Sequence, residues 1–433
     1  MLLYSHTINP RLKYITDFIG TELLNEPFQL TANREFFLKY EGAKINYSKE
    51  RITNSEFGIQ NSELLFENGI RPQSVECFEK NGHKAFYKTD GDFHFDIFAA
   101  SFYLLSRYEE YLPHKKDMYG RYAHENSLAF KENFLHLPII NIWLGNFKTA
   151  LETKYPELQF PHAKFQFIPT YDIDEAYSYK HKQWWRTMGG ITKSIAKGQW
   201  SKIGERISVL KGKKKDPFDS YQWMNQLHQK YNLKPYYFFL VAGKTGSHDK
   251  NILSSKNVMQ DLIREHSDRY SIGIHPSWQS GDDPDKLKFE ILKLGHISGK
   301  QILFSRQHFI RFTLPYTYRL LIDSGIKSDF SMGYGSINGF RASVASSFYW
   351  YDLEKEEQTK LLLYPFCFME ANSFFEQKFS PLQAFDELQH YYNVVKSVEG
   401  KLITIWHNTF LGTDKLYNGW REIYQQFISL IES

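Results

Sequence analysis

Cysteine is almost absent from this chain of 433 residues, which contains only Cys77 and Cys367. The two lie far apart and show no metal-ligand spacing, which argues against a disulfide framework and for a reducing compartment. Long apolar runs are missing as well, so no segment is expected to span a bilayer. The first residues, Met1 to His6, lack a basic start and an apolar core, and no signal peptide is expected. We therefore expect a cytoplasmic protein.

Charge of one sign is also scarce. Lysine and arginine total 53, aspartate and glutamate total 49, and the net charge of +4 is too small to indicate a nucleic-acid partner. Apolar residues are abundant, because 42% of the chain is hydrophobic and 17% is aromatic. A chain of this length and composition is expected to form two or three globular domains.

The sequence pattern changes near residue 160, where Pro156 and Pro161 interrupt the chain. Residues 1–160 mix short strand-like pieces with helices expected over Phe95–Tyr111 and Ile139–Tyr155, and they hold no cluster of catalytic residue types. We expect an α+β accessory domain that packs on the second domain and forms one wall of a substrate cleft. Its many aromatic residues suit either a packed core or contact with sugar rings.

Residues 161–433 contain strand-like runs, most of them separated by helical stretches. The seven runs are Phe165–Tyr171, Lys234–Val241, Tyr270–His275, Gln301–Arg306, Lys327–Met332, Leu361–Phe368 and Lys401–Trp406. Alternating strands and helices predict a parallel sheet, and seven or eight such units predict a closed barrel. The second domain is therefore expected to be an α/β barrel.

The first of these strands ends in two carboxylates, Asp172 and Asp174. Side chains alternate along a strand, so the two point to the same side. Two like charges this close are unfavourable unless a cation or a proton lies between them. The pair predicts one metal ligand and one proton-transfer group, with capping of a following helix as the alternative.

Three more strands end in side chains that can bind a metal or move a proton. The third delivers His275, the fourth delivers Arg306 and His308, and the last delivers His407. In α/β barrels the active site lies at the carboxyl ends of the strands, where the loops begin. A lone histidine at a strand end is usually a packing or surface residue. The coincidence at four strand ends predicts a shared catalytic face.

With these residues in place, the second domain resembles the NodB-homology polysaccharide deacetylases (carbohydrate esterase family four), in a branch with an extra N-terminal domain. The resemblance covers about residues 160–415 and implies a distorted (β/α)7 barrel that removes acetyl groups from sugars with a divalent metal, usually zinc. The first motif of some branches is D-V-D or D-V-E, in which the first carboxylate is the general base and the last binds metal. The resemblance therefore assigns Asp172 as the base and Asp174 as a metal ligand.

The second family motif, H-S/T-x-x-H, is only half present. His275 matches its first histidine, a metal ligand, but the position four residues later is Gln279, which is a poor ligand. A catalytic zinc takes about three protein ligands. His308 is our candidate for the missing one, because it alternates onto the strand face of Arg306. Binding of substrate, or orientation of another ligand, is the alternative role for His308.

The remaining family motifs assign the other roles. Arg306 matches the arginine that keeps the catalytic base ionised and aimed. His407, preceded by Ile405 and Trp406, matches the general acid. The fourth motif is matched only weakly, in the region of residues 329–341. From the resemblance we expect the substrate pocket to be lined by Trp278, Tyr334, Arg341 and Trp406.

The resemblance implies a metal-dependent hydrolase that removes acetyl groups from a cell-envelope polysaccharide or its lipid-linked precursor by metal-activated water. The acetylated glycan is then the expected partner. Two alternatives stay open. A catalytically degenerate carbohydrate-binding protein on the same barrel is suggested by the missing second histidine. A metal-dependent amidohydrolase acting on a small non-sugar substrate would use the same residue types.

A basic segment interrupts the second domain at about residues 180–215. It holds eleven lysines or arginines, one acid (Glu205) and three tryptophans, Trp184, Trp185 and Trp200. Apolar spacings of three and four predict broken amphipathic helices. Such helices can lie on an anionic membrane surface or grip an acidic glycan, and membrane contact would place the protein at the inner face of the membrane. A solvated insertion whose apolar face packs on the main domain is the alternative.

Overall fold

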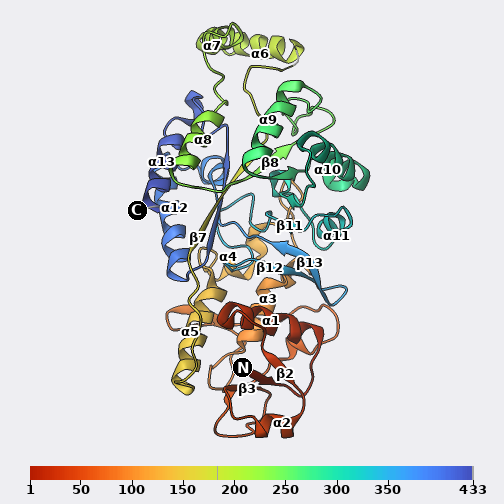
Figure 1. The fold of residues 1–433 in the computed structure, drawn as a ribbon, viewed down its shortest axis with the longest axis vertical. Helices are drawn as coiled ribbons and strands as arrows, with labels where there is room; N and C mark the ends of the chain where they lie inside the picture. Colours follow the sequence, from red (N-terminus) through yellow and green to blue (C-terminus); the bar gives the residue numbers. More distant parts are fainter. Residues whose placement is uncertain (183, 432–433) are drawn as a thin grey trace.

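The N-terminal third of the protein is built on a small parallel sheet. The structure is a computed structural model that describes residues 1–182 and 184–431, and this third lies at one end of the long axis (Figure 1). The four strands are ordered β2-β1-β3-β4. They are β1 Leu2–Tyr4, β2 Gln29–Thr31, β3 Lys44–Tyr47 and β4 Phe57–Ile59, and an antiparallel pair follows, β5 Cys77–Lys80 and β6 His83–Phe86.

Five helices accompany these strands in the described part of the N-terminal third. They are α1 Pro10–Leu24, α2 Arg34–Lys39, α3 Ile97–Leu105, α4 Leu128–Lys131 and α5 Ile139–Lys154. The expected helix over Ile139–Tyr155 is confirmed by α5. The one expected over Phe95–Tyr111 is shorter, because the chain leaves the helical conformation at Arg107, whose φ of 55° is left-handed.

A curled sheet of nine strands forms the centre of the molecule (Figure 1). The strand order is β12-β13-β11-β10-β9-β8-β7-β15-β14. All neighbours pair in parallel except β12 and β13, which are antiparallel. The sheet ends at β12 on one side and at β14 on the other, so backbone hydrogen bonds do not close it. The expected closed barrel is therefore an incomplete one in the described structure.

The strands of this sheet largely follow the expected runs, but β10 and β11 are only two residues long, and two further differences are found. Their bounds are β7 Gln166–Ile173, β8 Tyr236–Leu240, β9 Ser271–His275, β10 Phe304–Ser305, β11 Ser328–Asp329, β12 Phe348–Asp352, β13 Glu357–Leu363, β14 Phe368–Met369 and β15 Lys401–His407. The single run expected over Leu361–Phe368 is divided between β13 and β14. Pro365 lies in the break and has no backbone N–H to donate to a ladder. The antiparallel strand β12 was not expected.

Helices pack around the curled sheet, and one pair projects away from it. The helices are α6 Trp184–Ala196, α7 Trp200–Leu210, α8 Tyr221–Lys230, α9 Asn257–Arg269, α10 Pro284–Ser298, α11 Tyr316–Asp323, α12 Pro381–Ser397 and α13 Trp420–Ile431. Helices α6 and α7 contact each other and stand beyond the body, at the end opposite the N-terminal third (Figure 1). Of the helices in the described residues, none combines the length and apolarity needed to cross a bilayer.

The strand register brings the predicted strand ends to one edge of the sheet. His407 on β15 is the register partner of Asp172 on β7, and His275 is the partner of Leu240 at the end of β8. Ser305, the last residue of β10, pairs with Ile274. The carboxyl ends of these five parallel strands therefore lie at the same level, as needed for a shared site.

The two parts of the chain share one hydrophobic core. Buried apolar residues from Leu3 to Ile428 form a single cluster that crosses residue 160. Polar contacts also cross it: the Tyr14 hydroxyl donates to the Tyr349 carbonyl (2.8 Å), and the Arg341 guanidinium lies 2.6 Å from the Glu110 carboxylate. The first part is therefore packed against the second through its interior, not through a polar surface contact alone.

Candidate metal centre and active site

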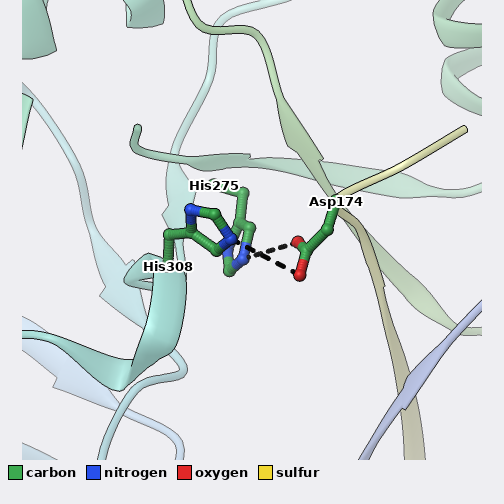
Figure 2. A group of neighbouring side chains, drawn as sticks. All are labelled: Asp174, His275 and His308. Carbon is green, nitrogen blue, oxygen red and sulfur yellow. Dashed lines mark ion pairs between the residues drawn. The ribbon is translucent and has the colours of Figure 1, made fainter. Parts of the chain in front are cut away.

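Three side chains from separate strand ends converge at the carboxyl edge of the sheet (Figure 2). Asp174 follows β7, His275 is the last residue of β9, and His308 opens a short turn after β10. The Nε2 atom of His275 lies 3.0 Å from Oδ1 of Asp174, and Nε2 of His308 lies 3.5 Å from Oδ2. One ligand atom from each residue lies within 4.8 Å of the other two, so the group could hold a metal ion.

The other ring nitrogen of each histidine has a fixed partner. Nδ1 of His275 lies 2.7 Å from the Arg306 carbonyl, and Nδ1 of His308 lies 3.3 Å from the Asp249 carboxylate. Both partners accept hydrogen bonds, so in the neutral form of each imidazole Nδ1 carries the proton and the Nε2 lone pair faces Asp174. This is the tautomer that metal-binding histidines adopt.

The donor set fits a divalent cation. Oδ1 of Asp174 is buried and accepts no hydrogen bond within the described residues, so a strong acceptor is left free beside two imidazole lone pairs. Two imidazoles and a carboxylate suit zinc. Gln279, which occupies the position of the second family histidine, is exposed at the surface. The structure brings His308 to the group instead.

Charges within the group are strongly coupled. Burial disfavours the charged form of Asp174, but the imidazoles of His308 and His275 outweigh it and hold the pKa of this carboxyl well below its usual value. Burial likewise lowers the pKa of His308, but Asp174 and Asp249 outweigh it and raise the pKa to about 9. The pocket therefore favours positive charge between these side chains, whether the charge is carried by protons or by a cation.

Asp172 lies beside the metal group and is held by Arg306. Both are buried, and Nη1 of Arg306 donates to Oδ1 of Asp172 at 3.3 Å. Nε of Arg306 donates to the Phe330 carbonyl (3.1 Å), and the guanidinium lies over the Phe238 ring at 4.7 Å. Oδ2 of Asp172 lies 3.9 Å from Nε2 of His275. The carboxylate is therefore oriented and faces the same space as the metal group.

His407 closes the opposite side. Its Nδ1 lies 2.7 Å from Oε1 of the fully buried Glu370, and its Nε2 lies 3.5 Å from Oδ2 of Asp174. Burial lowers the pKa of His407, but Glu370 and Asp174 outweigh it and hold the pKa well above its usual value. The imidazole can therefore keep a proton on Nε2 at neutral pH and present it to the cavity.

Two of these residues were not among the sequence candidates. Glu370 follows β14 directly and is an acid at the end of an apolar strand, the same signal that pointed to Asp172. It was not a candidate because the strand expected there ended at Phe368. Asp249 lies in the irregular loop between β8 and α9, where the sequence carries no such signal.

One cavity of about 380 Å³ is lined by Asp172, Asp174, His275, His308 and His407. Aromatic side chains form much of its wall, including Phe309 on one side and Phe375 and Phe410 from the loops after β14 and β15. Tyr119 and Arg121, from the N-terminal third, also line it. The first 160 residues therefore contribute directly to the wall of the cavity.

The predicted substrate-lining residues divide into two groups. Trp278 is half-buried and does not line the cavity, but its ring stacks on that of His248, which does, with centroids 4.1 Å apart. Tyr334, Arg341 and Trp406 are each at most 1% exposed, and the cavity wall does not include them. Their placement in the packed interior gives no support to a role in contacting substrate.

Physical reasons for this burial are visible for two of the three. Trp406 precedes His407 on β15, and strand alternation turns it to the opposite face, against Tyr424 of α13 at a centroid distance of 4.6 Å. Arg341 is held by the buried carboxylate of Glu110 in an ion pair that the sequence alone does not reveal.

The turn after His308 has an unusual backbone. Phe309 and Ile310 have φ values of 58° and 53°, a left-handed conformation that is costly for bulky side chains. Nη1 of Arg121 donates to the Phe309 carbonyl at 2.7 Å. Gly335 leaves room for this contact, because a Cβ atom there would clash with the Arg121 guanidinium. The N-terminal third thus holds the turn that carries His308.

Comparison with known proteins gives one family match and several similar structures. Residues 1–156 match the model of a family of unknown function, DUF7033. None of the curated proteins compared with the chain matches it. The similar solved structures include three named as polysaccharide deacetylases, from Mycobacterium smegmatis, Bacillus cereus and Pseudomonas aeruginosa PAO1, of which the first is a candidate and the third a probable deacetylase.

The three similarities are distant. The Mycobacterium smegmatis protein is 14% identical with a TM-score of 0.40, over 64% of this chain and 87% of that one. The Bacillus cereus enzyme is 7% identical with a TM-score of 0.32, over 62% and 89%. The Pseudomonas aeruginosa protein is 11% identical with a TM-score of 0.39, over 62% and 85%. At these values the case for function rests on the geometry of the site.

Proposed function

We propose that the protein is a metal-dependent hydrolase that removes acetyl groups from a glycan, either a cell-envelope polysaccharide or its lipid-linked precursor. One observation carries this proposal: a single cavity brings together a metal-ligand group, an arginine-held carboxylate and a carboxylate-held histidine. The proposed architecture is a distorted (β/α)7 barrel of the NodB type over residues 161–433, with residues 1–160 as an α+β accessory domain.

The metal, zinc in this proposal, would be held by Asp174, His275 and His308. Their two Nε2 lone pairs and the free Oδ1 atom form the donor set, and the Arg306 carbonyl and Asp249 fix the imidazole rings. When bound, such an ion polarises an acetyl carbonyl and lowers the pKa of water.

Asp172 is the proposed general base. Its carboxylate faces the metal group, and the buried Arg306 guanidinium 3.3 Å away stabilises the ionised form that can accept a proton from the attacking water. The same contact fixes the orientation of the carboxylate, because Arg306 is itself held by the Phe330 carbonyl.

His407 is the proposed general acid. Its Nδ1 donates to Glu370, so the proton that it can release is on Nε2, which faces the cavity. Transfer of that proton to the departing amine nitrogen or alcohol oxygen completes removal of the acetyl group. Asp172 and His407 are register partners on neighbouring strands and line the same cavity, which supports their action on one reacting centre.

The placement of His308 bears on the alternative of a degenerate binding protein. That alternative arose from Gln279 in place of a second histidine, and His308 supplies an imidazole to the group in its stead. This placement supports a metal-binding site over a degenerate one.

The decisive experiment measures acetate release by zinc-loaded protein from acetylated sugar oligomers and, in parallel, from small N-acetylated amino acids. We expect release from the sugars, none from the small amides, and none by the Asp172→Asn variant, which should keep its metal. Release from the small amides alone would support the amidohydrolase alternative. A zinc-loaded protein inactive on every acetylated glycan tested would overturn the proposal.

A further inference from the structure

Helices α6 and α7 form a hairpin, and most of the apolar side chains described on it are exposed. The hairpin projects from the body at the end opposite the N-terminal third (Figure 1). Because the side chains of Trp184, Trp185 and Ile191 lie outside the described part of the structure, α7 and the exposed residues of α6 carry the case.

One apolar stripe runs along α7. Trp200, Ile203, Ile207 and Leu210 recur at helical spacing and share a face. Trp200 is 68% exposed, Leu210 47% and Ile207 42%, and Ile203 is half-buried. On α6, Met188 and Ile195, two turns apart, are 55% and 50% exposed.

The inner side of α7 is the more polar one. It carries Glu205, which accepts a hydrogen bond from the Tyr179 hydroxyl (3.1 Å), and Arg206, which lies over the Tyr179 ring at 5.0 Å. Only Val209 of this side is apolar and buried. On α7 this arrangement argues against an apolar face packed on the main domain, and it leaves the apolar stripe open to a partner.

Positive charge surrounds the apolar stripe. The exposed lysines of the hairpin and the loop after it are Lys193, Lys197, Lys202, Lys211, Lys213, Lys214 and Lys215. Glu205 is the single acid between residues 180 and 215, and it faces inward. At the foot of the hairpin, Lys182, Arg186 and Arg206 line a cavity of about 120 Å³, which is large enough to admit a phosphate oxygen.

We propose that the α6–α7 hairpin docks the protein on an anionic phospholipid bilayer. An apolar stripe flanked by lysines matches the interface of such a bilayer, where the apolar side chains enter the acyl boundary and the lysines meet phosphate headgroups. A second copy of the chain is a poor occupant, because it would bring two sets of exposed lysines together. An acidic glycan would pair with the lysines but leave the exposed Trp200 and Ile207 unburied. The docking does not depend on the proposed hydrolase activity.

Vesicle sedimentation of the full chain tests this proposal. Vesicles of phosphatidylcholine with about 30% phosphatidylglycerol are compared with pure phosphatidylcholine, at about 0.05 M and about 0.5 M NaCl. We expect binding to the anionic vesicles at low salt, at least about tenfold weaker binding at high salt, and little binding to neutral vesicles. The same pattern in a chain carrying Asp172→Asn would show that docking is separate from catalysis.

Paired variants separate the apolar and electrostatic contributions. Trp200→Glu with Ile207→Glu should weaken binding at least about tenfold, because two apolar side chains no longer enter the bilayer. Replacing Lys213, Lys214 and Lys215 by Gln should weaken it about fivefold per lysine, equivalent to about 1 kcal/mol each. Leu38→Glu with Lys39→Gln, exposed positions on α2 at the opposite end of the molecule, is the control and should bind as the unmodified chain does.

Three results would overturn the proposal. The first is absence of binding to anionic vesicles at low salt, and the second is an equal loss of vesicle binding in the α2 control and the hairpin variants. The third is a dimer in sedimentation equilibrium that Trp200→Glu converts to a monomer, while the unmodified chain does not bind vesicles. Unchanged thermal melting shows that a variant is folded. If the glutamate variant fails that check, the lysine variant decides the matter, because its three positions are exposed.

Discussion

His308 is the residue whose replacement tests the site most directly. The candidate metal group contains this histidine and not Gln279, which stands four residues after His275, where a second histidine ligand was expected from the sequence resemblance. We therefore expect His308→Ala to lose most zinc affinity and Gln279→Ala, at an exposed position, to lose none. Asp249→Asn should reduce zinc affinity by an intermediate amount, because it removes the carboxylate that orients the His308 ring from 3.3 Å away, at Nδ1.

The size of each effect follows from the role of each side chain. Structural zinc sites with four ligands bind with about 10–16 kcal/mol, or roughly 3 kcal/mol per ligand. Loss of the His308 imidazole should therefore weaken zinc binding by about 10²–10³-fold. Loss of a carboxylate that only orients a ligand costs about 10–100-fold, which sets the expectation for Asp249→Asn.

Competition with a chromophoric zinc chelator measures these affinities, and circular dichroism confirms the fold of each variant. Affinity in His308→Ala equal to that of the unmodified protein would refute the assignment and leave His308 as a substrate-binding or orienting residue. Loss of zinc in Gln279→Ala would equally refute it, since that side chain would then reach the metal from a position that the structure places at the surface.

Three further predictions concern other parts of the molecule. Asp172→Asn should retain zinc and lose acetate release, whereas Asp174→Ala should lose both; equal zinc loss in the two would contradict a base role for Asp172. Burial raises the pKa of Glu110, but Arg341 and Arg107 outweigh it and hold the pKa at about 2, below the ordinary 4.5. The ion pairs of Glu110 with these two arginines therefore contribute stability above about pH 4.5 that is lost as pH falls toward 2, roughly 3 kcal/mol in all. In urea denaturation, the destabilisation caused by Glu110→Gln should shrink over that pH range, and a constant difference would refute the coupling. A fragment starting at residue 161 should be insoluble on expression, because it exposes the apolar surface of the shared core; a soluble, fully active fragment would refute a role of the first part in the cavity.

Much of the site could be predicted because it lies at strand ends. Asp172, His275 and His407 each terminate or nearly terminate an apolar run, and parallel strands align such ends at one edge. The same strand-end argument predicts His308, which follows β10, the strand next to β9. The alternation of side chains along a strand puts Asp172 and Asp174 on one side. By the same rule Trp406 points away from His407, so alternation alone predicts that Trp406 lies outside the site.

What could not be predicted depends on contacts between distant residues. Asp249 reaches His308 from a loop without regular structure, and Arg341 is buried by Glu110 from the other part of the chain. Neither contact leaves a local pattern in the sequence. In contrast, Pro365 does predict the division of one expected strand into β13 and β14, because proline is disfavoured in the interior of a β-ladder.

The left-handed turn at Phe309 and Ile310 links the first 160 residues to the position of His308. A strained turn persists only while its surroundings enforce it, and one hydrogen bond from Arg121 to the Phe309 carbonyl is part of that enforcement. The first 160 residues therefore help to set the position of His308, a candidate metal ligand. If this part were exchanged for an unrelated domain, the new domain would have to supply an equivalent hydrogen bond to the Phe309 carbonyl, or the turn would lose one of the contacts that position His308.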